Sequence, residues 1–244
     1  MIIGSDHSRW DWQNDDQGYC PIDWARSQSV FVFLKAFDGP NAALYYLDEI
    51  IAARMAGKLA APYVWCHGRN WYDPRRQAEA WYARLKDEPL IAVDFESYST
   101  SIPDYDDLYN AVNRLRELGY TGKLLLYTNW GYWLSYGTSA ALWLRLFDGG
   151  IWLSDPDDDP PVAPFWASAD EKLRKAPTPF PDLDPHQYGF SGNPNDYGIT
   201  NGKSAVDENK FMGTQAELEE LFGGTVVVPP EPQNKIVIKI RSNL

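Results

Sequence analysis

Apolar and polar positions along the chain follow two periods, one typical of buried strands and one typical of amphipathic helices. Eight short apolar runs predict strands at residues 2–6, 30–35, 61–65, 91–96, 124–128, 151–154, 186–188 and 204–209. Apolar residues at helical spacing predict helices at residues 42–55, 75–85, 105–118, 135–147 and 215–222. The two kinds of element alternate at intervals of about thirty residues, which is the spacing of repeated strand–helix units.

The last third of the chain departs from this alternation. Residues 155–185 and 191–201 are rich in Pro, Asp, Gly and Asn, so loops are expected there in place of helices. Eight strands alternating with helices favour an α/β fold, a closed β/α barrel whose first half is regular and whose last strands are joined irregularly. A chain of 244 residues with 44% hydrophobic content is large enough for one such domain, which we place at residues 1–224.

Two carboxylates stand at the end of the fourth predicted strand. An uninterrupted apolar run leads directly into Asp94-Phe95-Glu96, and such a run is typical of a strand covered on both faces. Because alternate residues of a strand point the same way, Asp94 and Glu96 share a face, with Cα atoms about 6.5–7 Å apart. Carboxylates this close repel when both are ionised, which raises one pKa and keeps a proton donor beside a charged partner. The pair suits cleavage of a glycosidic bond; an exposed acidic strand edge is the simpler alternative.

Polar and aromatic residues also occur at the ends of the other predicted strands. They are Asp6, Lys35 with Asp38, Tyr63 with Trp65, Tyr127 with Asn129, Gln187 with Tyr188, and Asp207 with Asn209. Each has a structural alternative, such as a turn cap, a core position or an ion pair. Because a barrel of this kind uses one rim for chemistry, their joint placement at strand ends favours a single functional site.

The composition narrows the class of ligand. A formal net charge of −12 disfavours nucleic acid and anionic membrane surfaces, because phosphate binding needs clustered Lys and Arg. Aromatic residues make up 15% of the chain and include 11 Trp, whose flat faces suit the apolar faces of sugars, so a glycan ligand is favoured. No apolar run is long enough to cross a bilayer and the start is not typical of a signal peptide, so we expect a soluble protein without an export signal.

Cysteine and histidine spacing gives little support to a metal site. Cys20 and Cys66 form no C-x-x-C pair, and the sequence leaves open whether they are free thiols or one disulfide. The histidines His7, His67 and His186 could lie near the rim, which leaves a metal-dependent barrel hydrolase as an alternative. Because no H-x-H or H-E-x-x-H spacing is present, we expect structural histidines and neither a metal nor another cofactor.

Eight segments together resemble glycoside hydrolase family 25, a family of lysozymes. They are GSDHSRW (4–10), FVFLKAFDG (31–39), APYVW (61–65), IAVDFE (91–96), LYTN (126–129), IWL (151–153), HQY (186–188) and VDENKF (206–211). The resemblance implies a flattened barrel of eight strands and about five helices. It also implies an N-acetylmuramidase, which cuts the β-1,4 bond between N-acetylmuramic acid and N-acetylglucosamine in bacterial peptidoglycan.

The resemblance assigns roles to individual residues. It makes Glu96 the general acid and lets Asp94 stabilise charge or orient the substrate acetamide, with Asp6 and Asp207 completing an acidic floor. Residues implied to line the sugar subsite are Tyr63, Trp65, Tyr127, Gln187, Tyr188 and Asn209. The spacing of Asp94 and Glu96 is compatible with a retaining or an inverting outcome. For a substrate with a 2-acetamido group, we favour attack by the acetamide oxygen with net retention.

A glycan-binding barrel without catalysis remains an alternative from another class, although a binding module has no need of four clustered acids. The tail predicts a second module: residues 225–234 are Pro-rich and predict a linker, and residues 235–244 alternate like the first strand of an SH3-like cell-wall-binding module. An extension that packs back on the barrel is the alternative. We expect a monomer that acts on the cell wall after release from the cytoplasm, as endolysins are, or after secretion.

Overall fold

The fold is described from a computed structural model, at residues 2–14, 18–97, 100–129, 146–154, 185–200, 206–211 and 213–224. Several expectations fall outside these ranges. They are nearly all of the helix at residues 135–147, the loop at residues 155–184, the linker at residues 225–234 and the strand at residues 235–244.

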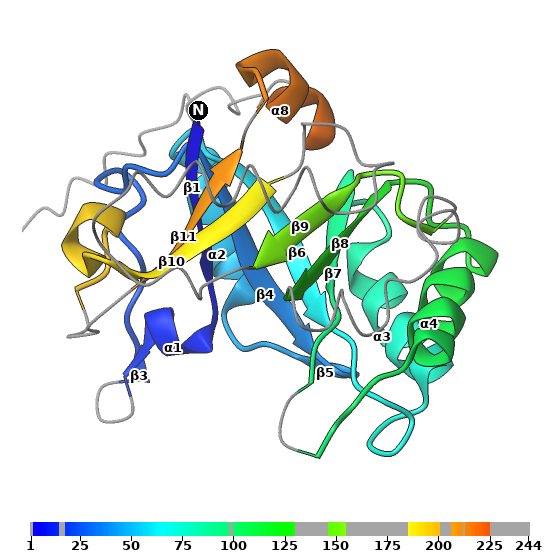
Figure 1. The fold of residues 1–244 in the computed structure, drawn as a ribbon. Coiled ribbons are helices and arrows are strands. Elements are labelled where there is room, and N and C mark those ends of the chain that lie inside the picture. The colour runs from blue at the N-terminus through cyan, green and yellow to red at the C-terminus, as the bar shows by residue number, and fades with distance from the viewer. Residues whose placement is uncertain are drawn as a thin grey trace, which may run out of the picture.

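Among the described residues, eight strands close into a ring (Figure 1). In ring order they are β1 (Ile2–His7), β11 (Val206–Phe211), β10 (Pro185–Gly192), β9 (Ile151–Ser154), β8 (Lys123–Asn129), β7 (Leu90–Asp94), β6 (Leu59–Trp65) and β4 (Phe31–Asp38). The ring closes because β1 pairs with both β11 and β4. The eight predicted strands and the barrel are confirmed.

One strand runs against the rest. The neighbours from β1 through β4, β6, β7, β8 and β9 to β10 are parallel, whereas β11 is antiparallel to both β10 and β1. The alternation of strands and helices did not predict this reversal. It decides where the residues of β11 lie in the site.

Three helices cover the outside of the strands, as Figure 1 shows. They are α2 (Tyr46–Met55), α3 (Pro74–Leu85) and α4 (Tyr105–Glu117); α3 and α4 lie within one residue of their predicted ranges. Asp73 caps α3 by accepting from the backbone N–H groups of Arg75 and Arg76, and Asp104 forms a capping box with Asp107 at the start of α4. The remaining described helices are α1 (Arg9–Trp12), the 3₁₀ turn η1 (Pro194–Tyr197) and α8 (Gln215–Leu221).

The helix predicted from residue 42 begins later, at Tyr46. Residues Asn41–Ala42 instead form the short strand β5, which turns back and pairs with the end of β4. Gly39 makes this turn possible at φ 57°, a left-handed conformation that favours glycine, and a Cβ there would lie 2.8–2.9 Å from the rings of Tyr72 and His67. A second short pair, β2 (Gln13–Asn14) with β3 (Gly18–Tyr19), follows α1.

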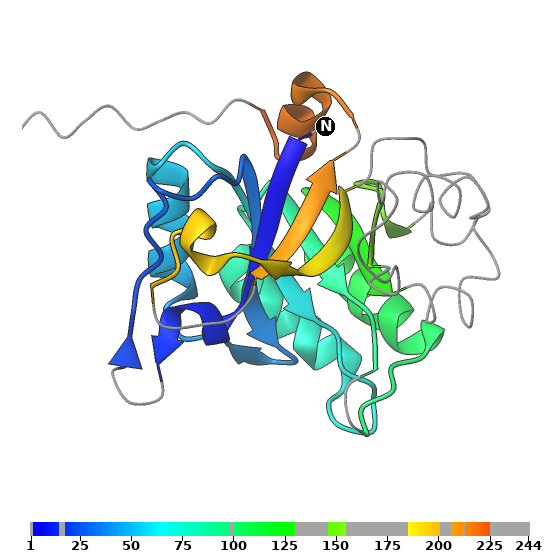
Figure 2. The same ribbon diagram turned by 60° about the vertical axis from the view of Figure 1, so that its left-hand side comes forward.

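The strands bury two separate apolar layers because their side chains alternate between the two faces. The outer layer, between strands and helices, includes Val64, Val93 and Leu126, against Trp81 and Leu115 of the helices. The inner layer fills the barrel and consists of Phe31, Phe33, Leu59, Ala61, Tyr63, Leu90, Ala92, Leu125, Tyr127, Trp152 and Phe211, with Leu218, Leu221 and Phe222 at its base. Figure 2 shows α8 at the end where β1 begins, so this end is plugged and the opposite rim is left for a site.

Glu49 of α2 is a buried carboxylate that ties the helix to the segment before β4. It accepts hydrogen bonds from Tyr19 Oη (2.9 Å), the Ile22 N–H (3.3 Å) and Trp24 Nε1 (2.7 Å). Burial raises the pKa of Glu49, and these three donors oppose that rise.

We expect Glu49→Ala to lower the free energy of unfolding by about 2–4 kcal/mol, because it leaves buried donors without an acceptor. Urea denaturation of this variant and of Asp48→Ala, its exposed neighbour, measures the effect. A similar small loss in both variants would mean that the three hydrogen bonds contribute nothing specific.

Candidate active site

Asp94 and Glu96 point into the open end of the barrel, as the alternation predicts. Asp94 ends β7 and is 4% exposed, while Phe95 is buried in the outer apolar layer. The Phe95 N–H donates to the Tyr127 carbonyl (2.8 Å), and Thr128 Oγ1 donates to the Phe95 carbonyl (2.9 Å). These bonds keep the chain extended past Asp94, so the inward face of the strand continues to Glu96.

Asp6 and Asp207 lie opposite each other in the antiparallel pair of β1 and β11. Asp207 was expected near the carboxyl end of its strand. The structure places it at the start of β11 instead, and it reaches the same rim because β11 is reversed. The structure therefore brings Asp6 and Asp207 together as predicted. The prediction, however, assumed that Asp207 lies at the carboxyl end of its strand.

Asn209 lies beneath the rim rather than on its surface. It is fully buried, it accepts from Trp152 Nε1 (2.9 Å) and it donates from Nδ2 to Asp6 Oδ2 (2.8 Å). Both ends of its amide are therefore used inside the protein. Sequence analysis predicts that Asn209 lines the sugar subsite; in the structure its side chain links Trp152 of the inner aromatic layer to Asp6.

Burial raises the pKa values of three carboxyl groups in the site. It raises the pKa of Asp94 well above the usual range, with the charge of Glu96 adding to the rise and Lys35 opposing it. Burial also raises the pKa of Glu96, against the hydrogen bond from Asn129, and raises the pKa of Asp207 to about 6. These carboxyls therefore keep their protons to a higher pH than ordinary surface carboxyls do.

The two central acids differ in their hydrogen bonds. Asn129 Nδ2 donates to Glu96 Oε2 (3.1 Å). Asp94 Oδ1, in contrast, is buried and accepts no hydrogen bond from any residue that the structure describes. A buried acceptor without a donor is costly, so this oxygen is suited to a donor that a ligand would bring.

Aromatic rings and one lysine form the wall beside these acids. Tyr63 and Tyr127 are each 8% exposed, and burial raises the pKa of both phenols, so they stay protonated. Trp65 is half-buried, and Lys35 Nζ lies 4.0 Å from the centre of its ring. The sequence places Lys35 and Asn129 at strand ends and assigns them no role, so this position is the only sequence signal for them. The side chains of the predicted residues Gln187 and Tyr188 lie outside the described part.

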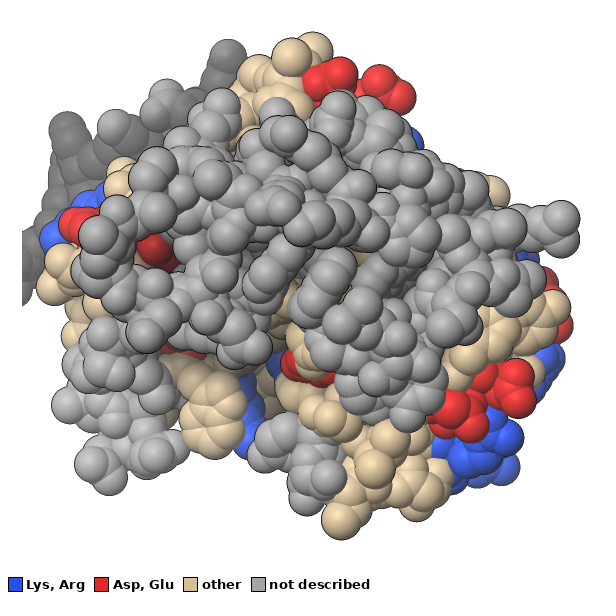
Figure 3. All heavy atoms as spheres, viewed as in Figure 1, with Lys and Arg blue, Asp and Glu red and all other residues tan. Residues whose placement is uncertain are grey.

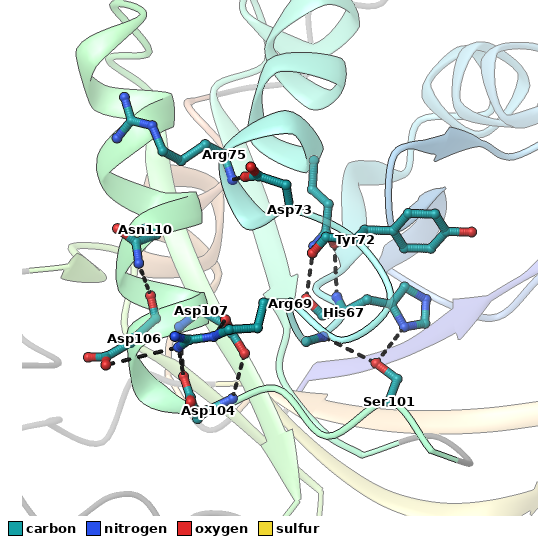
Figure 4. Close-up of polar contacts among 12 residues, drawn as sticks. His67, Arg69, Tyr72, Asp73, Arg75, Ser101, Asp104, Asp106, Asp107 and Asn110 are labelled. Carbon is teal, nitrogen blue, oxygen red and sulfur yellow. Dashed lines mark hydrogen bonds and ion pairs between the residues drawn. The ribbon is translucent and has the colours of Figure 1, made fainter.

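Hydrogen bonds fix the loops around the rim, as the close-up in Figure 4 shows for His67 and Ser101. His67 bonds through Nδ1 to Ser101 Oγ (2.9 Å) and through Nε2 to Asp38 Oδ1 (2.5 Å). It thereby joins the end of β4 to the loops that follow β6 and β7. Arg69 on the same loop contacts Asp104 (2.7 Å) and Asp107 (2.6 Å) at the start of α4 (Figure 4).

The other histidine with a described side chain also has partners of its own. His7 Nε2 lies 2.7 Å from Ser5 Oγ, which in turn lies 2.6 Å from Ser29 Oγ. Burial lowers the pKa of His7 to about 3, so it is neutral at pH 7. His7 and His67 thus belong to separate networks. Cys20 and Cys66 are both free thiols, which answers the question that the sequence left open.

The raised pKa of Asp207 predicts a pH-dependent stability. A carboxyl whose pKa is higher in the folded state stabilises the fold below its ordinary pKa, about 4, and this contribution is lost as the pH rises through about 6. We expect Asp207→Asn to raise the melting temperature relative to wild type at pH 7 but not at pH 4. The difference between variant and wild type cancels other titrating groups, including His7. The same substitution at exposed Asp87 is the control, and an equal shift at both pH values would contradict the prediction.

Solved structures resemble the chain across almost its full length, whereas no protein-family model and no curated protein matches it. A bacterial lysozyme from Streptomyces coelicolor has a TM-score of 0.66 at 19% identity, covering 91% of this chain and 96% of that one. The catalytic domain of endolysin ply40 from bacteriophage P40 of Listeria monocytogenes has a TM-score of 0.64 at 16% identity, covering 92% and 98%. A glycosyl hydrolase 25 of Streptococcus pneumoniae, described as a virulence factor, has a TM-score of 0.63 at 14% identity, covering 91% and 93%.

At these identities the likeness establishes the fold. The chain has the irregular β/α barrel of the glycoside hydrolase family 25 lysozymes, muramidases and endolysin catalytic domains, as the eight sequence segments implied. No described helix is long and apolar enough to span a membrane.

Proposed function

We propose that this protein is a peptidoglycan hydrolase, an N-acetylmuramidase that cleaves the β-1,4 bond between N-acetylmuramic acid and N-acetylglucosamine. The observation that supports it most is the buried oxygen Asp94 Oδ1, which lies beside Glu96 in a barrel of lysozyme type and has no donor among the described residues. An acetamide N–H is the donor that such a substrate brings.

Substrate binding would redistribute the proton of the acidic pair. Asp94 is the more deeply buried of the two acids and has the more strongly raised pKa, so we place the proton on Asp94 before substrate binds. An acetamide N–H bonded to Oδ1 stabilises the ionised form of Asp94. The proton then favours Glu96, where Oε2 already accepts from Asn129, so Oε1 is the oxygen that holds it.

The reaction follows from this arrangement. Glu96 transfers its proton to the glycosidic oxygen as the bond from that oxygen to the sugar carbon breaks. The acetamide oxygen, oriented through its N–H by Asp94, attacks the same carbon and forms a cyclic oxazolinium intermediate. Glu96, now ionised, takes a proton from water as the water opens this ring, so the product keeps the starting configuration. Asp6 and Asp207 hold the acidic floor, and Tyr63 and Tyr127 form the wall beside the sugar.

Cell-wall digestion tests the proposal. The protein is incubated with purified bacterial walls, turbidity is followed, and new reducing ends are converted to alditols with borohydride. A muramidase yields muramitol. Glucosaminitol would indicate the other glycosidic bond, and binding to walls without new reducing ends would favour the non-catalytic alternative. Retention of activity after exhaustive EDTA treatment would argue against the metal-dependent hydrolase.

A further inference from the structure

The amide of Asn209 is held at both ends inside the barrel. Its Oδ1 accepts from Trp152 Nε1 (2.9 Å), and its Nδ2 donates to Asp6 Oδ2 (2.8 Å). Asn209 is fully buried and Asp6 is 9% exposed, so water has little access to these bonds. This one amide therefore connects the apolar core to a carboxyl of the site.

The chemistry of its two neighbours permits only one orientation of this amide. An indole N–H can only donate, so the atom that faces Trp152 must be the amide oxygen. The amide nitrogen then faces Asp6, and its N–H needs a lone pair on Oδ2. A proton on Oδ2 would place two donors against each other, so this oxygen of Asp6 remains an acceptor.

The aromatic core fixes the place of that donor. Trp152 is buried, and its ring stacks on Phe33 with ring centres 4.4 Å apart and meets Tyr127 edge-on, also at 4.4 Å. Close packing on these sides resists rotation of the indole. Because Asn209 is bonded to this indole, its N–H groups stay at a fixed point beside Asp6.

Acids on the surface of the molecule have a different setting. In Figure 3 acidic and basic atoms adjoin one another at the lower right, where α4 lies in Figure 1. Arg69 and Asp104 form such a pair (2.7 Å), and both side chains are more than half exposed, so solvent screens their attraction. Asp6 is instead buried, opposite Asp207, whose pKa burial raises to about 6. A hydrogen bond donated to a buried carboxylate favours its ionised form.

We propose that Asn209 is a positioning residue, which keeps Asp6 ionised and holds its carboxylate in place for the reaction. The inference rests on the proposed muramidase function. A fixed negative charge at Asp6 stabilises the positive charge that develops on the sugar, because no group has to reorganise as that charge forms. Asn209 acts through Asp6 and does not touch the sugar, so its effect is on turnover and not on substrate binding.

A double-mutant cycle with Asp6 tests this role. Asn209→Asp keeps the shape of the side chain and still accepts from Trp152. Its second oxygen faces Asp6 Oδ2, and two carboxyls this close share one proton, which the bond from Trp152 to position 209 leaves on Asp6. On soluble, uncrosslinked peptidoglycan strands, Asn209→Asp should lower kcat about tenfold or more, with KM within about twofold of wild type. Asp6→Asn should lower kcat at least as much, and the double variant should be no slower than Asp6→Asn.

A second variant and a matched control accompany this cycle. Asn209→Ala removes the donor without adding a carboxyl, and it should show a similar loss of kcat and the same coupling to Asp6→Asn. Asn113→Asp makes the matched change at a half-buried position on the outer helix α4 and should leave kcat unchanged. Circular dichroism checks that each variant is folded.

If the two losses of kcat multiply in the double variant, Asn209 acts independently of Asp6 and the inference is overturned. A rise in KM with unchanged kcat would also overturn it, because Asn209 would then contact the sugar. The melting temperatures of the same variants report the bond between Asn209 and Asp6 without any reaction, since residues in contact couple in stability. Failure of the proposed function gives a different result, in which the melting temperatures are coupled but wild type releases no reducing ends.

Discussion

Replacing Glu96 by Gln should reduce wall lysis by about 10²–10⁴-fold, the range typical for loss of a general acid. Gln has nearly the shape of Glu and can still bond to Asn129, but it has no proton to give to the leaving oxygen. Binding of wall fragments should therefore survive. The rate of release of reducing ends measures the effect, and circular dichroism checks that the variant is folded.

The matched control for this variant is Glu219→Gln, a half-buried position on α8 at the closed end of the barrel. It makes the same chemical change far from the rim, so lysis should be unchanged. Lysis near the wild-type rate by folded Glu96→Gln would show that the proton donor is another group.

Much of this site could be predicted because it depends on local pattern. Period-two alternation alone places Asp94 and Glu96 on one face, and the apolar run before them predicts a buried strand, as β7 is. Tyr63 and Tyr127 follow the same rule on β6 and β8. The order of the strands predicts the barrel, and the rule that barrels carry their chemistry at the carboxyl ends of the strands then places these residues in one site.

The remaining features depend on contacts between distant segments, which a local pattern does not contain. The direction of β11 is set by its pairing with β1 and β10, and only that pairing explains how Asp207 reaches the rim. The late start of α2 results from the pairing of β5 with β4. The sequence predicts Asn209 at the rim. In the structure it is buried, because its side chain bonds to Trp152 and Asp6, which lie on other strands.

The pairing of Asp94 with Glu96 predicts a second large effect. Asp94→Asn should reduce lysis by about 10²–10³-fold, comparable to the loss of one preorganised group that stabilises the transition state. An amide at this position cannot take up negative charge, so it can neither balance the positive charge that develops on the sugar nor hold the acetamide N–H as firmly. Rates of reducing-end release on the same walls measure the effect.

Measurements of stability and of pH dependence distinguish a catalytic role of Asp94 from a structural one. Asp94 is buried beside Glu96 with a raised pKa and one oxygen without a described donor, so the ionised side chain is costly to the fold. Asp94→Asn should therefore melt at the same or a higher temperature than wild type at pH 7 while losing activity.

The wild-type pH–rate profile should be a bell whose limbs belong to the coupled pair. In Asp94→Asn the acidic limb should weaken, because no second carboxylate has to be ionised. A variant that is both inactive and strongly destabilised, with the bell intact in its residual activity, would make Asp94 a structural residue and leave the orientation of the acetamide to another group.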